Sequence, residues 1–236
     1  FSELDGEGRD LGQDREFAQR VRRLKRELYD EYGFFYYVPM AESYAVQLPV
    51  TVSCSYGRCL FCDLNQGMRF RALSMEEIAA NVERLQAIHE RDRRPPTRFL
   101  LAGGNPLVLG TEALLRIAGM VRSAFPSCAY ISAFARADDV LRKTPAELEA
   151  LRGAGYDRFC LGVESGSDRV LRYQEKGVGR EENARAMAAL EAAGIAFSVY
   201  VMLGLGGREM SADHVEGTAS LLNAARPFEL TVVTLV

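Results

Sequence analysis

A repeated alternation of short apolar strands with amphipathic helices constrains the fold of this chain more than any other feature of its sequence. The predicted strands cover residues 47–53, 98–104, 128–135, 157–165, 195–207 and 229–236, and a helical pattern follows each of the first five. Short, β-branched strands that are apolar on both faces are typical of a parallel sheet covered by helices. Right-handed connections between such strands curl the chain into a barrel or a doubly wound sheet. The sequence therefore predicts an α/β fold built from six β/α units.

Residues with strong positional preferences mark the ends of several predicted helices. Ser74 and Ser211 stand where N-cap side chains are expected, and Thr144 followed by Pro145 is typical of a helix start. Gly155 and Gly194 end their helices just before the next strand. These signals support the helix boundaries.

Residues 1–45 are predicted to form an extension in front of a core that spans residues 46–236. The first 13 residues are rich in glycine and acidic side chains, which indicates a loose arm. Between residues 14 and 32, apolar positions recur every three or four residues and predict an N-terminal amphipathic helix. The aromatic segment that follows is expected to be an edge strand or a plug. Because the chain starts at Phe1 and ends inside an apolar run, we expect a core truncated at its C-terminus.

Composition excludes some classes of protein. With 236 residues, 48% of them hydrophobic, the chain can bury the core of one large domain or two small ones. A net charge of −3 gives no overall attraction to nucleic acid or membrane, and no apolar run is long enough to span a bilayer. If the protein contacts RNA, it would do so through the basic face of the predicted N-terminal helix, which carries Arg22, Arg23 and Arg26. Such basic faces are usually only solvated. Low cysteine usage and reduced-thiol chemistry favour the cytoplasm.

The most specific chemical feature is the run CSYGRCLFC, in which Cys54, Cys59 and Cys62 have the spacing C-x4-C-x2-C. Iron–sulfur clusters generally take four cysteine ligands, so three thiolates would hold a [4Fe–4S] cluster with one open iron. Zinc is the alternative, but structural zinc sites need a fourth ligand. A disulfide framework is disfavoured because the five cysteines are an odd number and no signal peptide precedes them. Candidates for the fourth zinc ligand, none at finger-like spacing, are His89, His214, Cys128, Cys160 and Asp63.

Short motifs follow the later predicted strands in the same order as the strands. They read AGGNP from residue 102, GVESG from residue 162, EKG from residue 175 and LGLGG from residue 203. Together with the cysteine run, they resemble the motifs of the radical S-adenosylmethionine (radical SAM) superfamily over residues 46–236, with the subfamily left open. The resemblance implies a partial (β/α)6 TIM-like barrel, with the cluster loop after the first strand.

The resemblance also implies a set of site residues. Phe61 would lie beside the SAM adenine, Gly103 and Gly104 near the SAM amino group, and Asn105 takes the position of the family's acid. An arginine near the end of the third strand, where Ser132 also lies, is well matched to the SAM carboxylate. The expected metal ligands are Cys54, Cys59 and Cys62, and the expected cofactor-binding residues are Phe61, Gly103, Gly104, Asn105, Arg136, Glu164, Lys176, Met202, Leu203 and Gly204.

The implied activity is reductive cleavage of SAM to a 5′-deoxyadenosyl radical that abstracts hydrogen from a small molecule, a peptide or RNA. The implied cofactors are a [4Fe–4S] cluster and SAM, and the implied partner is an electron donor such as flavodoxin or ferredoxin. Two alternatives stay open: a non-catalytic zinc- or iron–sulfur-binding module, and a non-radical barrel enzyme with incidental cysteines. In the first alternative Glu164 would be dispensable, and in the second Cys59 would be.

Overall fold

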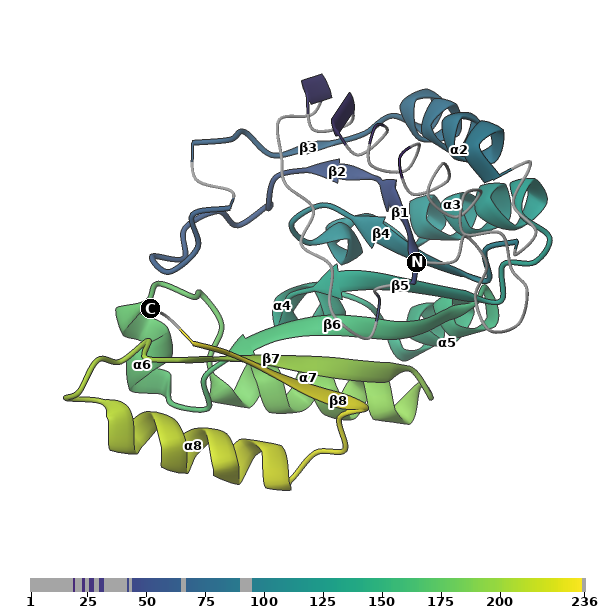
Figure 1. The fold of residues 1–236 in the computed structure, drawn as a ribbon. Helices are drawn as coiled ribbons and strands as arrows, with labels where there is room; N and C mark the ends of the chain where they lie inside the picture. The colour runs from purple at the N-terminus through teal and green to yellow at the C-terminus, as the bar shows by residue number, and fades with distance from the viewer. Residues whose placement is uncertain are drawn as a thin grey trace, which may run out of the picture.

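A curved sheet of six parallel strands is the centre of the fold (Figure 1). The computed structural model describes residues 44–64, 67–89 and 95–234, together with positions 19, 23, 26, 27, 30, 31 and 42. In spatial order the strands are β1 (Val46–Pro49), β4 (Arg98–Ala102), β5 (Tyr130–Ala135), β6 (Tyr156–Glu164), β7 (Ala196–Leu203) and β8 (Glu229–Thr234).

Each strand of this sheet pairs in parallel with the strand that precedes it in the sheet order. Adding every new strand at the same edge makes the sheet curl in one direction. Among the described residues β1 and β8 are the two edges of the sheet, so the barrel is partial. The prediction of an α/β partial barrel with six strands is confirmed.

Helices cover the outside of the curved sheet (Figure 1). Among the helices of residues 44–234, the five long ones agree with the predicted ones, and they are α2 (Met75–His89), α3 (Thr111–Ala124), α5 (Pro145–Gly153), α7 (Arg180–Ala192) and α8 (Ser211–Asn223). Three short helices were not predicted as helices: η2 (Pro106–Val108), α4 (Ala137–Leu141) and α6 (Asp168–Tyr173). Segments of three to six residues are too short to show a helical repeat of apolar positions.

The predicted first strand, residues 47–53, is divided in two. After β1 ends at Pro49, the backbone N–H of Val50 donates to the carbonyl of Ala102, and the chain then leaves the sheet. β2 (Thr51–Val52) pairs in antiparallel fashion with β3 (Arg71–Ala72), which sequence patterns did not indicate. This short ladder holds together the two ends of the loop that carries the three clustered cysteines.

Helix-end signals are confirmed in most places. The Ser74 hydroxyl accepts from the Glu77 backbone N–H at 3.2 Å, and the Thr144 hydroxyl accepts from the Glu147 backbone N–H at 3.3 Å. Gly155 and Gly194 have positive φ angles of 98° and 66°, as expected of residues that end a helix.

Ser211 is an exception among the predicted caps. It is the first residue of α8, and Met210 occupies the cap position without a side-chain hydrogen bond. Among the helices that the structure describes, none combines the length and the apolar character that crossing a membrane requires.

The amino ends of the strands are closed by a buried ionic cluster. Glu42 is fully buried and lies 3.2 Å from the Arg158 guanidinium and 3.7 Å from that of Arg98. Arg98 also makes two 2.9 Å hydrogen bonds to the Asp157 carboxylate. Burial raises the pKa of Glu42, and the neighbouring arginines act in the opposite direction.

Most of the predicted N-terminal extension lies outside the described residues. This applies to the arm at 1–13, the aromatic segment at 33–40 and the apolar positions of the predicted amphipathic helix. Within that helix, positions 19, 23, 26, 27, 30 and 31 are helical. Arg84 of α2 forms ion pairs with Glu27 and Glu31 at 3.3 and 2.8 Å, so this segment contacts the core.

Candidate functional site

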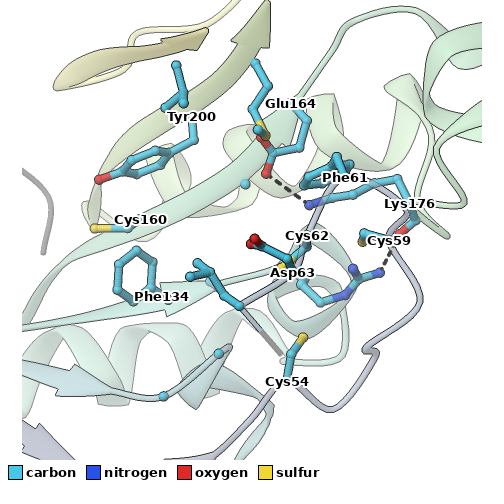
Figure 2. Close-up of a pocket in the computed structure, with 18 of the residues that line it drawn as sticks. Cys54, Cys59, Phe61, Cys62, Asp63, Phe134, Cys160, Glu164, Lys176 and Tyr200 are labelled. Atoms are coloured by element: carbon cyan, nitrogen blue, oxygen red, sulfur yellow. Dashed lines mark hydrogen bonds and ion pairs between the residues drawn. The ribbon is translucent and has the colours of Figure 1, made fainter. Parts of the chain in front are cut away.

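A cavity of about 520 Å³ lies at the carboxyl ends of the strands, where barrel enzymes place their chemistry. Its wall combines the cysteine loop with residues from five neighbouring strands, which Figure 2 shows on opposite sides of the cavity. The lining residues are Cys54, Cys59, Leu60, Phe61, Cys62, Asp63, Leu64, Ala102, Gly103, Gly104, Phe134, Ala135, Arg136, Cys160, Gly162, Glu164, Lys176, Tyr200, Met202 and Val233.

All three clustered cysteines line this cavity and are half-buried. The loop between them is held in place, because the Cys62 N–H donates to the Cys59 carbonyl and the Leu60 N–H donates to the Gln174 carbonyl. Burial raises the pKa of the Cys59 thiol, and the positive charges of Lys176 and Arg136 oppose that effect.

The donor set of three thiols that line one cavity fits an iron–sulfur cluster. In the part of the chain that the structure describes, no three His, Cys, Asp or Glu side chains converge on one metal position. A single zinc ion needs all its ligands at one point, whereas each cysteine of an iron–sulfur cluster takes a different iron. Of the candidate fourth zinc ligands only Asp63 and Cys160 line the cavity; His214 instead pairs with Ser165 at 2.9 Å.

Glu164 and Lys176 form a buried ion pair inside the cavity, with 3.2 Å between the carboxylate oxygen and Nζ (Figure 2). Glu164 ends β6 with a φ of 65°, a conformation that non-glycine residues adopt only at a cost. A Cβ added at Gly162, two residues earlier on the same strand face, would lie 2.5 Å from the Glu164 oxygen and 3.0 Å from Nζ. The glycine therefore leaves the space that the ion pair occupies.

The turn behind Glu164 is held by α8. Besides the pair between His214 and Ser165, the Thr218 hydroxyl accepts from the Gly166 backbone N–H at 2.8 Å. Gly166 and Gly217 approach so closely that a Cβ on either would collide with the backbone of the other. Burial lowers the pKa of His214, so the imidazole is kept neutral.

Arg136 lies at the end of β5 and lines the cavity, although most of its surface is buried. Its guanidinium donates to Asp138 at 2.9 Å and to the Lys176 carbonyl at 3.0 Å. The guanidinium also lies 4.0 Å from the centre of the Tyr56 ring, and the Tyr56 hydroxyl donates to the Glu175 carbonyl at 2.7 Å. Arg136 and Tyr56 together join the cysteine loop to the segment that carries Lys176.

The remaining predicted residues divide into two groups. Phe61 and Met202 line the cavity and pack on a small cluster of Val170, Leu205 and Met210. The ammonium of Lys176 lies 5.6 Å from the centre of the Phe61 ring. Gly103 and Gly104 also line the cavity, and both approach the start of the cysteine loop more closely than a Cβ would allow.

Asn105, Leu203 and Gly204 were predicted to contact the cofactor, but the structure places all three outside the cavity lining. Asn105 is fully buried and hydrogen-bonded to Ser55. Leu203 and Gly204 are exposed. Successive residues of a strand face opposite sides of the sheet, so when Met202 faces the cavity Leu203 faces away from it.

Sequence reasoning missed part of the cavity. Phe134, Tyr200 and Val233 line it from β5, β7 and β8, and Cys160, considered above only as a fourth zinc ligand, is buried and also lines the cavity. The signal that was available is the period of two: Cys160, Gly162 and Glu164 share one face of β6.

Comparisons with known proteins show the family of this chain. The family model "Radical SAM superfamily" matches residues 48–222. The 4′-phospho-dehydrooxetanocin synthase of Priestia megaterium is 28% identical over 205 residues, which are 75% of this chain and 26% of the synthase.

Two solved structures share the fold. The cobalamin-dependent S-adenosylmethionine radical enzyme OxsB, with aqua-cobalamin bound, aligns with a TM-score of 0.55 and 23% identity over 72% of this chain and 26% of OxsB. Methylornithine synthase (PylB) aligns with a TM-score of 0.60 and 16% identity over 92% of this chain and 59% of PylB. The chain thus spans about a quarter of the length of the synthase and of OxsB. Its family match and its cysteine-lined cavity lead to one conclusion: this chain belongs to the radical SAM superfamily, whose enzymes use a [4Fe–4S] cluster and SAM.

Proposed function

We propose that this chain binds a [4Fe–4S] cluster and SAM in the described cavity and cleaves SAM reductively. The observation that carries the proposal is that Cys54, Cys59 and Cys62 line the same cavity as Glu164, at the end of β6, and Lys176, which follows α6. When bound, the cluster supplies one electron that divides SAM into methionine and a 5′-deoxyadenosyl radical, which then abstracts hydrogen from a substrate.

The cysteines are the proposed cluster ligands, and the charges around them favour that role. A thiolate, not a thiol, binds iron, and burial alone would keep Cys59 protonated. The cations of Lys176 and Arg136 favour the thiolate. Glu164 and Asp138 pair with these two cations at 3.2 and 2.9 Å and so offset the cost of burying them.

The proposed SAM site uses charges of both signs, as a ligand with an ammonium, a sulfonium and a carboxylate requires. Arg136 and Lys176 are the candidate partners of the carboxylate, and Glu164 is the candidate acceptor from the ribose hydroxyls or the amine. Phe61 and Met202 offer an apolar surface for the adenine. Closing such a cavity around the ligand excludes water from a reactive radical.

The test uses anaerobically reconstituted protein with dithionite and SAM but without substrate. 5′-Deoxyadenosine is measured by chromatography and mass spectrometry for the wild type, Cys59→Ala and the matched control Cys128→Ala, whose thiol is buried away from the cavity. We expect product from the wild type and the control and none from Cys59→Ala. Equal product from Cys59→Ala would refute the proposal, and bound zinc without any cluster would favour the non-catalytic module.

The proposed reaction also requires a reductant, a cellular compartment that keeps the thiols reduced, and a substrate that donates hydrogen. An electron donor of the flavodoxin or ferredoxin type would reduce the cluster, and the cytoplasm would keep the thiols reduced. The hydrogen donor is a small molecule, a peptide or RNA. RNA binding through Arg22, Arg23 and Arg26 would weaken as salt concentration rises, which a filter-binding assay measures.

A further inference from the structure

The side chain of Asn105 connects the end of β4 to the cysteine loop. Its Oδ1 accepts from the backbone N–H of Ser55 at 2.9 Å, and its Nδ2 donates to the Ser55 hydroxyl at 2.8 Å. The same Nδ2 donates to a carboxylate oxygen of Asp139 at 2.8 Å. Ser55 directly follows Cys54, so Asn105 holds the residue next to the first cluster ligand.

Both hydrogen-bond donors of the Asn105 amide are already used within the protein. An asparagine has two N–H donors, and both are used, one toward Ser55 and one toward Asp139. The orientation is set by its surroundings, because a rotated amide would turn its oxygen toward the Asp139 carboxylate and its N–H group toward the Ser55 N–H. Asn105 is also fully buried and does not line the cavity. No N–H of this side chain is left for a ligand in the cavity.

Asp139 extends the connection to a second element of the site. Its side chain is fully buried in the first turn of α4 and accepts from the Arg136 backbone N–H at 3.4 Å. The Arg142 guanidinium donates to its other oxygen at 2.8 Å. Through Asp139, the Asn105 amide is tied to the strand end that presents Arg136 to the cavity.

We infer that Asn105 and Asp139 form a positioning pair that fixes Cys54 for cluster binding, and that Asn105 is not a contact of the SAM amino group. The inference rests on the proposed function, since it takes the cluster as the ligand of Cys54. Asn105 stands where the sequence resemblance expected an acid near that amino group. Its contacts assign it to the support of the cysteine loop instead.

A charge swap tests the pair. Asn105→Asp places two buried carboxylates at the 2.8 Å contact, where they repel each other. We expect the [4Fe–4S] content after reconstitution to fall about tenfold, which is the size of effect seen when a group that orients a metal ligand is removed. Asn105→Asp with Asp139→Asn restores one amide and one carboxylate with the donor and acceptor exchanged. The long 3.4 Å bond from the Arg136 N–H is lost, because the oxygen that accepts it becomes an amide nitrogen. The Ser55 hydroxyl can turn to donate to the new carboxylate. We expect this double variant to recover iron content and the electron paramagnetic resonance spectrum of the reduced cluster to within about twofold.

A control separates positioning from general damage by a buried charge. Asn183 of α7 is also buried and lies outside the cavity lining. We expect Asn183→Asp to lower the thermal stability of the protein while leaving the iron content per folded protein unchanged. Circular dichroism of each variant before reconstitution measures the folded fraction by which the iron content is divided.

SAM affinity of the cluster-loaded double variant distinguishes the two roles of Asn105. If residue 105 touched the SAM amino group, a carboxylate there would tighten binding about tenfold through a charge-assisted hydrogen bond. We expect the dissociation constant to change by less than about twofold, because the new carboxylate stays engaged with Ser55 and with the amide introduced at position 139.

Each outcome has one meaning. Asn105→Asp with wild-type iron content, no recovery in the double variant, or tightened SAM binding would each overturn the inference alone. Wild-type protein that holds a cluster but forms no 5′-deoxyadenosine would refute the proposed reaction and leave the positioning pair standing. Wild-type protein that takes up no cluster would refute both.

Discussion

Replacing Gly104 by alanine is the sharpest test of how the end of β4 supports the cysteine loop. A Cβ at this position would lie 2.6 Å from the Cβ of Cys54, 2.7 Å from its Cα and 2.7 Å from the Ser53 carbonyl oxygen. Real Cβ atoms do not approach other atoms so closely, and two of the three neighbours are backbone atoms. The Gly104 N–H also donates to the Ser53 carbonyl at 3.0 Å, so strand end and loop cannot separate without losing that bond.

The rigidity of these neighbours sets the loss of stability that we expect from Gly104→Ala. Overpacking a well-packed site costs about 1–3 kcal/mol, and we expect the upper end, about 3 kcal/mol, because no flexible side chain can move aside. For a domain of this size, that corresponds to a decrease in Tm of about 6–12 °C. The clash with the new Cβ can be relieved only if Cys54 moves away from β4, so we also expect the cluster content after reconstitution to fall.

Gly119→Ala is the matched control, since it makes the same chemical change in the middle of α3 with no atom within 4 Å of the new Cβ. We expect this variant to gain about 0.5–1 kcal/mol from helix propensity and to keep full cluster content. Urea denaturation of the protein before reconstitution measures the free energy of unfolding, and iron and sulfide analysis measures the cluster. If Gly104→Ala matches Gly119→Ala in stability and iron content, the close support of Cys54 by β4 is wrong.

Three further predictions concern buried groups and a helix end. Lys176→Met leaves the Glu164 carboxylate buried without its partner and should lower the free energy of unfolding by about 3 kcal/mol. Adding Glu164→Gln to this variant should restore most of that loss. Equal losses in the single and double variants would contradict the ion pair. Burial lowers the pKa of His214 below 6.5, so the unfolded chain binds the extra proton first and the wild type should lose stability as pH falls through 6.5. In His214→Gln, the denaturation midpoint should depend less steeply on pH between about pH 8 and 5 than in the wild type. Identical slopes in the two proteins would show that His214 does not cause the loss of stability. Thr144→Ala removes the capping hydroxyl of α5 and should cost about 1 kcal/mol, or a Tm decrease of about 2–4 °C in calorimetry; an unchanged Tm would show that the cap contributes nothing.

Local patterns were enough to locate most helices and strands. The caps at Ser74 and Thr144 and the glycines at 155 and 194 act through neighbouring residues, so their effect is already present in the sequence. The same holds for the order of the strands, because connections between sequential parallel strands have one hand. Prediction was wrong at Ser211, which is the first residue of α8 and not its cap, and silent about β3, whose partner β2 is distant along the chain.

The site was predictable to the extent that chemistry resides in spacing. Cys54, Cys59 and Cys62 could be chosen as ligands from their separation along the chain, and the structure brings them to one cavity. Glu164 could be placed at a strand end and Lys176 in the segment that follows it, but their 3.2 Å contact depends on the turn that α6 makes between them.

What the sequence alone determined is therefore the long helices, most of the strands and the identity of the clustered thiols, since these follow from residues close together in the chain. The tertiary structure decided which side chains share the cavity. The folded sheet decides which face of each strand lines the cavity, so Cys160 and Tyr200 line it and Leu203 does not. It also decided that Asn105 supports the cysteine loop, because its partners Ser55 and Asp139 lie 50 and 34 positions away along the chain and meet it only in the folded protein.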